Sequence, residues 1–289
     1  MKRDLQNSDL NSLLPDVQVD RRSFVAACIA AGFAVSAEPV LAQAIKTPMD
    51  GLEGGDIKIG DMPAYYAVPK EGGARPVVLV VAEVFGLHEH IKDVTRRVAK
   101  EGYFAIANEP YYRIGELWKL DDIKQVIEGA NKLPDDQMYS DLDATLAWAA
   151  KSDRAAAAKL GITGFCRGGR TVWMYSAHQP KVKAGVAWYG GLSPAQPVIT
   201  QTPADVVAHL KAPVLGLYGG ADQGIPQDQV DKLKAALQAG DKQAKESQIH
   251  VYEGMPHGFN ADYRPSYRKE AAEDGWKRML AWFKQHGVA

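Results

Sequence analysis

The chain of 289 residues is 46% hydrophobic and 24% charged. It is long enough to bury a sizeable core, and its composition excludes a disordered or fibrous protein. The formal net charge is −1, and the sequence has no long basic run. A nucleic-acid surface is therefore not expected, because phosphate binding requires clustered Lys and Arg. A small molecule is the expected partner.

Residues 1–44 differ from the rest of the chain. A twin-arginine stretch, Asp20-Arg-Arg-Ser-Phe-Val25, precedes an Ala-rich apolar run that ends near Val35, and Ala42-Gln-Ala44 follows. This order is typical of a twin-arginine export signal with an A-x-A cleavage site. A membrane-anchoring helix is the alternative, but the apolar run is shorter than the roughly 20 residues that spanning requires. We predict cleavage after Ala44, a periplasmic or secreted protein, and no stable membrane association after cleavage.

Cleavage would also change the charge and the cysteine content of the chain. Residues 1–44 contain four basic and five acidic residues together with Cys28, so the remainder would be formally neutral. Cys166 would then be its only cysteine. No internal disulfide could form, and Cys166 would be carried as a free thiol into an oxidising compartment.

Beyond about Asp56, strand-like apolar runs alternate with helical stretches. Segments 56–59 and 64–68 predict an opening hairpin, and the apolar run 76–82 predicts a strand buried on both faces. This alternation indicates βαβ units in one mainly parallel sheet flanked by helices. Further strands are expected at 103–107, 160–165, 184–189, 214–218 and 249–253, and helices at 91–100, 139–151, 168–178, 227–239 and 265–286.

Segment 114–136 is the least regular part of this region. It carries charges together with Trp118, and we expect it to form a cap or flap over the edge of the sheet. No stretch resembles a linker to a second domain. Residues 45–289 are therefore expected to form a single α/β domain.

Cys166 lies in Gly164-Phe-Cys-Arg-Gly168, between a predicted strand and a predicted helix. A nucleophile elbow requires this context. The glycines allow close packing around a strained turn, and the N-terminus of the following helix stabilises a thiolate or an oxyanion. The motif alone leaves open a buried structural cysteine or a phosphate-binding loop, because such small-x-small elements recur widely.

A cysteine nucleophile needs a base and an orienting acid, which follow it in chain order in this architecture. Asp222 ends a Gly-Gly turn after the strand at 214–218, and His257 lies on a Gly- and Pro-flanked loop after the strand at 249–253. Taken singly, Asp222 could be a turn or capping residue and His257 an exposed loop residue. Together with Cys166 they have the order of a catalytic triad.

The other histidines fit a catalytic role less well, because they lie inside predicted strands, on predicted helices or near the chain end. His88 and His90 are two residues apart and lack the H-E-x-x-H spacing of a zinc site. We predict no metal and no cofactor. We expect His88 and His90 to line or flank the entrance of the site.

Five separated motifs give the chain a family resemblance. From about Gly54 onward it resembles the dienelactone hydrolase (carboxymethylenebutenolidase) family of α/β-hydrolases, which use a Cys-Asp-His triad. The resemblance implies an α/β-hydrolase fold. It also implies that Cys166 is the nucleophile, Asp222 the orienting carboxylate and His257 the base. The matching motifs are Ala82-Glu-Val-Phe-Gly86, Glu109-Pro-Tyr-Tyr-Arg113, Gly164-Phe-Cys-Arg-Gly-Gly169, Gly219-Gly-Ala-Asp222 and Pro256-His-Gly-Phe259.

The resemblance implies four further roles. Glu83 matches the family's acidic residue that takes part in activating the thiol. Arg113 matches an arginine that holds the substrate's carboxylate, for which a guanidinium is suited by its paired hydrogen bonds. The backbone N–H groups of Val84 and Arg167 would form the oxyanion hole.

The chain departs from the family at two positions. Ala261 replaces a second arginine four residues beyond the histidine, while Arg264 and Arg268 are nearby but out of register. Arg167 stands where an apolar residue is usual. These departures indicate a changed or broader substrate range.

The expected activity is hydrolysis of small lactones or esters that carry a carboxylate, through an acyl-thioester on Cys166. A broad carboxylesterase or thioesterase is the alternative among enzymes. A non-catalytic binding protein, or a redox sensor that uses Cys166, is the alternative outside them. The oligomeric state is not predicted.

Overall fold

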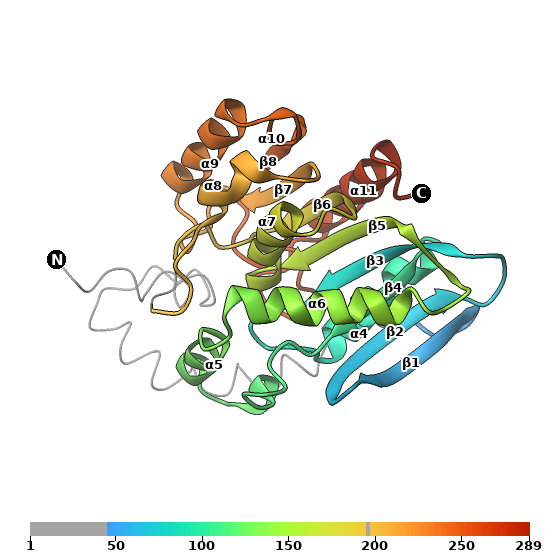
Figure 1. Ribbon diagram of the computed structural model, residues 1–289. Coiled ribbons are helices and arrows are strands. Elements are labelled where there is room, and N and C mark those ends of the chain that lie inside the picture. The colour runs from blue at the N-terminus through green and yellow to red at the C-terminus, as the bar shows by residue number, and fades with distance from the viewer. Residues whose placement is uncertain (1–44, 195–196) are drawn as a thin grey trace.

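An eight-stranded sheet forms the centre of the protein, with the strand order β1-β2-β4-β3-β5-β6-β7-β8. The computed structural model describes residues 45–194 and 197–289, and Figure 1 shows the sheet with its surrounding helices. The predicted export signal lies outside the described residues. The strands are β1 (Leu52–Ile59), β2 (Met62–Pro69), β3 (Arg75–Val81), β4 (Phe104–Asn108), β5 (Ala155–Phe165), β6 (Val182–Trp188), β7 (Val214–Gly219) and β8 (Gln248–Tyr252).

The sheet is antiparallel at one edge and parallel over the rest. β2 pairs with β1 and with β4 in antiparallel register. Every pairing from β4 through β3, β5, β6 and β7 to β8 is parallel. The predicted hairpin and mainly parallel sheet are therefore confirmed. Because parallel strands end at the same edge, the loops after β3, β5, β6, β7 and β8 lie at one edge of the sheet, where ligands bind in such folds.

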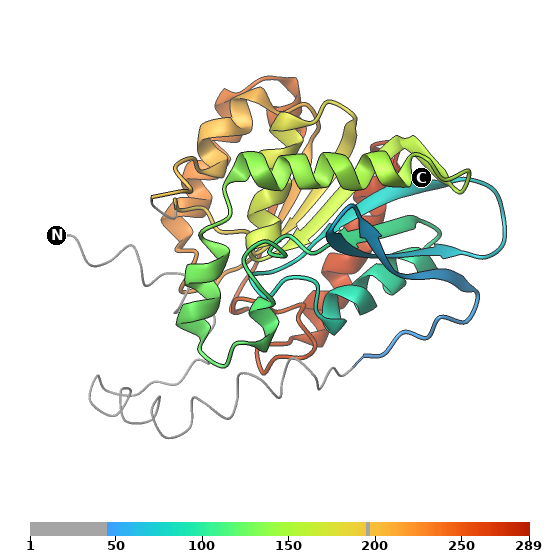
Figure 2. The same ribbon diagram turned by 60° about the horizontal axis from the view of Figure 1, so that its bottom comes forward.

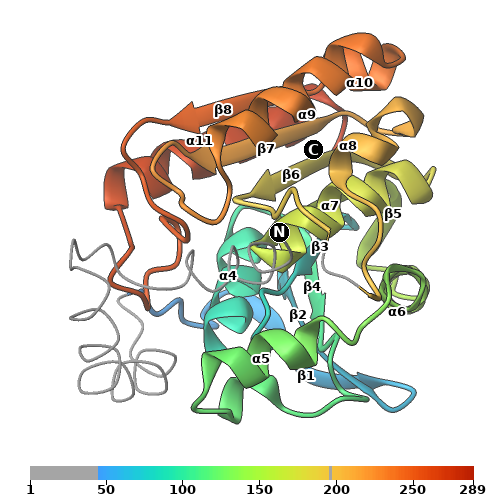
Figure 3. The same cartoon turned by 90° about the vertical axis from the view of Figure 1, so that its left-hand side faces the viewer.

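Helices cover both faces of the sheet, as Figure 3 shows. On one face, the Tyr175 hydroxyl of α7 donates a 2.6 Å hydrogen bond to Asp143 of α6. On the other, Trp276 of α11 donates a 3.2 Å hydrogen bond to Glu101 at the end of α4. Among the described residues, we find no helix whose length and apolar character would let it span a bilayer. The helices are α4 (Glu89–Lys100), α5 (Ile123–Ala130), α6 (Asp135–Ala149), α7 (Arg167–His178), α8 (Pro203–Val206), α9 (Gln227–Ala239), α10 (Lys242–Glu246) and α11 (Lys269–Gln285), with 3-10 helices η1 (Leu117–Lys119) and η2 (Val207–His209).

The two fully buried tryptophans of the core have hydrogen-bonded indole groups. Trp173 and Trp188 are fully buried. The indole N–H of Trp173 donates a 3.0 Å hydrogen bond to the Tyr218 hydroxyl, and that of Trp188 a 3.1 Å bond to Thr163 Oγ1. An unpaired buried donor would be costly, so these bonds fix how α7 and the central strands pack.

Segment 114–136 is more regular than the sequence predicts. It contains η1 and α5, and Figure 2 shows α5 as a separate short helix beside the start of α6. Asp122 caps α5 by accepting a 2.9 Å hydrogen bond from the Lys124 N–H. α6 begins earlier than predicted, at Asp135, where two acidic residues in the first turn favour a helix start.

The start of the last helix was predicted wrongly. It was expected at 265, but α11 begins at Lys269. Arg268 has extended backbone angles, and its N–H donates a 2.9 Å hydrogen bond to the Phe259 carbonyl. This bond holds residues 265–268 in turns against the His257 loop, and the helical pattern of the sequence does not reveal it.

Candidate active site

Cys166 occupies a strained turn between β5 and α7. Its φ is 53°, in the left-handed region that non-glycine residues seldom adopt. A Cβ atom on Gly164 would lie 2.4 Å from the Gly168 carbonyl oxygen, and one on Gly168 would lie 2.3 Å from the Val81 carbonyl oxygen. Both glycines are therefore sterically required. The turn places Cys166 at the N-terminus of α7, the arrangement of a nucleophile elbow.

Asp222 and His257 form a buried pair on the loops after β7 and β8. His257 Nδ1 lies 2.7 Å from Asp222 Oδ2, and the Gly224 N–H donates a 2.9 Å hydrogen bond to Asp222 Oδ1. Each residue is only 5% exposed. The backbone thus holds the carboxylate, the carboxylate orients the imidazole ring, and Nε2 is left to face another group.

The surroundings of His257 favour a protonated imidazole. Burial lowers the pKa of His257, but the charges of Asp222 and Cys166, with the hydrogen bond to Asp222, raise it to about 10. His257 Nε2 is buried and has no hydrogen-bond partner in the described part of the chain. A neighbouring imidazolium stabilises a thiolate, which is the reactive form of cysteine.

Glu83 is a buried carboxylate in the loop after β3. Its Oε2 accepts a 2.6 Å hydrogen bond from the Tyr263 hydroxyl and lies 3.4 Å from His88 Nε2. Burial raises the pKa of Glu83, but His88 and the positive charge of Arg264 hold it below its ordinary value. Glu83 Oε1 is buried and has no hydrogen-bond partner within residues 45–194 and 197–289. One oxygen of Glu83 is therefore held and the other is available.

Arg264 is a largely buried guanidinium in the same region. It lies 5.5 Å from the centre of the Phe85 ring and 5.6 Å from that of the Tyr263 ring. Burial lowers its pKa, but the charges of Tyr263, Glu83 and Cys166 raise it above its ordinary value. In the described residues it forms no ion pair with a carboxylate. Arg264 is thus a desolvated cation near the cysteine, at a position that the sequence analysis set aside as out of register.

Tyr111 and Tyr189 are two further buried residues near the cysteine that the sequence analysis missed. Their hydroxyls have no hydrogen-bond partner among the described residues. Burial raises both pKa values, and the charge of Cys166 adds to the effect. Tyr189 follows β6 with a φ of 36°, and its ring centre is 4.9 Å from that of His257. Its position after a parallel strand is the sequence signal that could have identified it.

Arg113 contacts a carboxylate of the chain itself. Its two terminal nitrogens lie 2.8 and 3.0 Å from the two oxygens of Asp141. The guanidinium also stacks 4.1 Å from the centre of the Tyr112 ring, and the side chain is 43% exposed. The Arg113 guanidinium, which was predicted to bind a substrate carboxylate, is therefore already hydrogen-bonded to the Asp141 carboxylate.

The Arg167 side chain has a structural contact that accounts for its presence in the elbow. It is 8% exposed, and its Nη2 donates a 3.2 Å hydrogen bond to the Leu133 carbonyl between α5 and α6. Arg170, one turn later, forms a two-pronged ion pair of 2.6 and 2.8 Å with Asp135. These arginines tie the start of α7 to the start of α6.

Glu109 joins the loop after β4 to the loop after β3. Its Oε2 accepts a 2.7 Å hydrogen bond from the Leu87 N–H, and its Oε1 accepts a 2.9 Å bond from the Tyr111 N–H. Gly86 has a φ of 79°, and a Cβ atom there would lie 2.3 Å from Glu109 Oε1. Glu109 therefore acts as a brace between the two loops, holding the backbone at Leu87 and at Tyr111.

The placement expected for His88 and His90 was wrong. Neither lines an entrance, because they are 3% and 0% exposed. His88 lies beside Glu83, and His90 Nδ1 lies 2.9 Å from Asp262 Oδ1. A nearby carboxylate, Glu83, faces His88 inside the protein, and a distant one, Asp262, faces His90.

The fold and this arrangement of cysteine, histidine and aspartate define an α/β-hydrolase. The model of the dienelactone hydrolase family matches residues 62–287, and the chain belongs to that family. It is a carboxylic ester hydrolase that cleaves lactone or ester bonds.

Two proteins that the chain resembles share one name, and a solved structure that it resembles is named as a dienelactone hydrolase. The chain is 52% identical over 290 residues to a Methylorubrum extorquens protein named "Putative carboxymethylenebutenolidase", covering 98% of this chain and 99% of that one. A protein of the same name from Escherichia coli K12 is 48% identical over 269 residues, covering 89% and 96%. A solved structure from Klebsiella pneumoniae, named "Putative Dienelactone Hydrolase", is 47% identical with a TM-score of 0.77. The match covers 81% of this chain and 99% of that one.

A more distant relative carries a more specific name. A Bradyrhizobium protein named "Probable 2-oxo-3-(5-oxofuran-2-ylidene)propanoate lactonase" is 29% identical over 228 residues, covering 77% of this chain and 89% of that one. The molecule in that name is a lactone that carries a carboxylate.

Proposed function

We propose that this hydrolase opens small carboxylate-bearing lactones through a Cys166–His257–Asp222 triad and an acyl-thioester intermediate. One arrangement carries the proposal: Cys166 sits on a strained elbow at a helix N-terminus, and Asp222 orients a buried His257 at 2.7 Å on the loops at the same edge of the sheet. Residues held in rare backbone conformations are concentrated at functional sites.

In the first half of the reaction, the Cys166 thiolate attacks the lactone carbonyl carbon and a tetrahedral oxyanion forms. The backbone N–H groups of Val84, after β3, and Arg167, first residue of α7, would stabilise that oxyanion. The ring C–O bond then breaks, and the leaving oxygen takes a proton from His257. The ring-opened acyl group remains on the sulfur as a thioester.

In the second half, a water molecule attacks the thioester and gives a proton to His257. The C–S bond breaks, the carboxylic acid leaves, and the thiolate with its imidazolium partner is restored. A thiolate leaves easily, so esters and enol-lactones with good leaving groups are favoured over amides. Glu83 would take part in activating the thiol through its unpartnered Oε1.

Recognition of the substrate carboxylate is assigned to the two arginines. Arg113, the position that the family resemblance implies, could bind it only in competition with Asp141. Arg264 is more buried and has no carboxylate partner among the described residues, so we propose it as the stronger site. A guanidinium in a water-poor position binds a carboxylate strongly. The carboxylate-bearing lactone in the name of the Bradyrhizobium relative supports this substrate class.

Assays of the purified protein on a dienelactone and on p-nitrophenyl acetate test the proposal. Cys166→Ala and His257→Ala should each abolish turnover of both, whereas His178→Ala, a histidine on the far end of α7, should leave both unchanged. Turnover that survives in the two triad variants would exclude the triad. If the protein cleaves only p-nitrophenyl acetate, a broad esterase is favoured. If it cleaves neither compound, a non-catalytic binding protein or redox sensor is favoured.

We also propose that the protein works in the periplasm or outside the cell, reached through the twin-arginine pathway. The support is the sequence of residues 1–44. Replacing Arg21 and Arg22 by lysine should keep the protein in the cytoplasm at its full length, while the unmodified chain should be exported and shortened. An unmodified chain that stays in the cytoplasm with residues 1–44 attached would refute this.

A further inference from the structure

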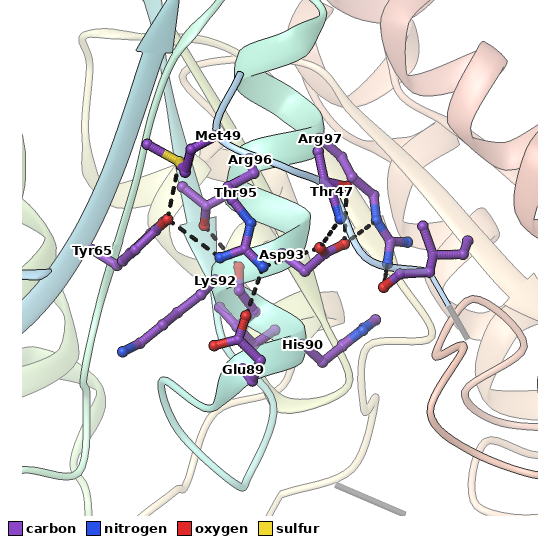
Figure 4. A network of polar contacts seen from close by, with 12 residues as sticks. Thr47, Met49, Tyr65, Glu89, His90, Lys92, Asp93, Thr95, Arg96 and Arg97 are labelled. Carbon is purple, nitrogen blue, oxygen red and sulfur yellow. Dashed lines mark hydrogen bonds and ion pairs between the residues drawn. The ribbon is translucent and has the colours of Figure 1, made fainter. Parts of the chain in front are cut away.

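The segment that follows the predicted cleavage site is anchored to α4. The Thr47 N–H donates a 2.6 Å hydrogen bond to Asp93 Oδ1, and the Thr47 hydroxyl lies 3.2 Å from Asp93 Oδ2. Arg96 and Arg97 hold the same carboxylate from one turn further along the helix. Figure 4 shows Thr47 beside Asp93, with the two arginines around it. Residues close to the predicted mature amino end thus have fixed places in the fold.

Ile45 has a contact of a different kind. Its backbone N–H donates a 2.7 Å hydrogen bond to Asp262 Oδ2. The Asp262 side chain is fully buried, and its other oxygen faces His90 at 2.9 Å and Arg97 at 3.1 Å. The first residue after the predicted cleavage site therefore points its nitrogen at a buried carboxylate on the loop that follows His257.

We propose that Asp262 is the docking site for the α-ammonium group that cleavage after Ala44 would create on Ile45. Cleavage converts this same nitrogen from an amide with one N–H into a cation with three donors. The present hydrogen bond is charged only on its carboxylate acceptor, whereas the bond from an ammonium would join two opposite charges at a buried position. The proposal rests on the predicted cleavage site and requires nothing of the substrate.

The docking site is connected to the candidate active site. Asp262 is followed by Tyr263, whose hydroxyl holds Glu83 at 2.6 Å. The His90 ring, paired with Asp262, is 4.8 Å from the Tyr263 ring and 5.9 Å from the His88 ring, and His88 in turn lies 3.4 Å from Glu83. A docked amino end therefore supports, through packed buried rings, the position of Glu83. Asp262 is in this sense a positioning residue.

The experiment compares two forms that differ by one residue, one beginning at Ile45 and the other at Ala44. Both contain every described residue and both carry a free amino group, so they differ only in Ala44 and in the position of the charge. The form that begins at Ile45 should melt higher, by on the order of 2–4 °C for each kcal/mol gained in a domain of this size. Equal melting temperatures would overturn the proposal without any substitution in the protein.

Two variants locate the effect. Asp262→Asn should remove the difference between the two forms, whereas Asp93→Asn, which weakens the neighbouring Thr47 anchor, should lower both melting temperatures and keep the difference. A difference that persists in Asp262→Asn would overturn the assignment to Asp262. The amino-terminal sequence of the exported protein is the second check, and a start at any residue other than Ile45 would refute the docking.

The connection to Glu83 has its own readout. The rate at which iodoacetamide alkylates Cys166 should differ between the Ile45 and Ala44 forms, and the difference should vanish in Asp262→Asn. Equal rates would remove the link to the site. Because melting and alkylation need no substrate, failure of the docking is distinguishable from failure of the proposed lactone hydrolysis.

Discussion

The Tyr263 hydroxyl donates a 2.6 Å hydrogen bond to Glu83 Oε2, across 180 residues of sequence. It joins the loop after β3 to the loop that carries His257. Both residues are buried, and the bond leaves only Glu83 Oε1 without a partner among the described residues. Tyr263 therefore fixes which oxygen of Glu83 can act on the thiol or the substrate.

Tyr263→Phe is expected to lower activity without unfolding the protein. A hydrogen bond to a charged group contributes roughly 1.5–3 kcal/mol, which corresponds to a loss of about 10- to 150-fold if it all appears in the transition state. The loss should appear in kcat and in the rate of Cys166 alkylation, because we propose that Glu83 takes part in activating the thiol. Tyr267→Phe, on the same loop but partly exposed, serves as the control. An unchanged alkylation rate in Tyr263→Phe would show that Tyr263 has only a packing role and does not affect the thiol through Glu83.

Arg264→Gln is expected to raise KM for a carboxylate-bearing lactone by about 10- to 100-fold, on the same scale for charged hydrogen bonds. Its effect on neutral p-nitrophenyl acetate should be small. Arg113→Gln is the matched comparison. It should raise KM for the lactone less, because the Arg113 guanidinium is already bonded to Asp141. The ratio of the two KM values in each variant is the measurement. If Arg113→Gln changed this KM ratio more than Arg264→Gln, Arg113 would be the residue that binds the substrate carboxylate.

Gly168→Ala is expected to destabilise the elbow. The added Cβ would lie 2.3 Å from the Val81 carbonyl oxygen, a contact with backbone that no side-chain motion relieves. Overpacking of this kind costs roughly 1–3 kcal/mol, and moving the turn would displace Cys166 and reduce turnover as well. Gly73→Ala is the control, because a Cβ atom there meets nothing within 4 Å. Urea unfolding of both variants gives the comparison.

The sequence predicted the elements whose signals are local. The apolar run of β3, the helical spacing of α9 and the Gly-x-Cys-x-Gly turn all identify themselves without knowledge of the rest of the chain, and the structure places them as predicted. Chain order then brought Asp222 and His257 to loops after neighbouring parallel strands, since such strands end at the same edge.

The rest of the site depends on contacts between distant residues. Arg264 was set aside because it lies three residues from the expected register, yet the turn before α11 brings its guanidinium near Glu83. Arg113 matched its motif by position, but its Asp141 partner is 28 residues away. His88 precedes α4 and His90 lies in its first turn, and the carboxylate that faces His90 comes from Asp262, far along the chain. Local patterns carry none of this information, because each case is decided by tertiary packing.

The brace formed by Glu109 predicts a pH dependence of stability. Burial raises the pKa of Glu109, and the N–H groups of Tyr111 and Leu87 only partly offset this, so the pKa is about 7. In the unfolded chain an ordinary glutamate titrates near 4.3. Between these values the folded state holds a proton that the unfolded state has released, so the free energy of unfolding should fall as the pH rises from about 4.5 through 7.

Glu109→Gln cannot titrate and should remove that part of the decline in the free energy of unfolding, which is at most about 1.4 kcal/mol per pH unit. Glu128→Gln, at an exposed position on α5, should keep it. The test is urea unfolding of the three proteins between pH 5 and pH 8, and equal slopes in all three would exclude Glu109 as the titrating group.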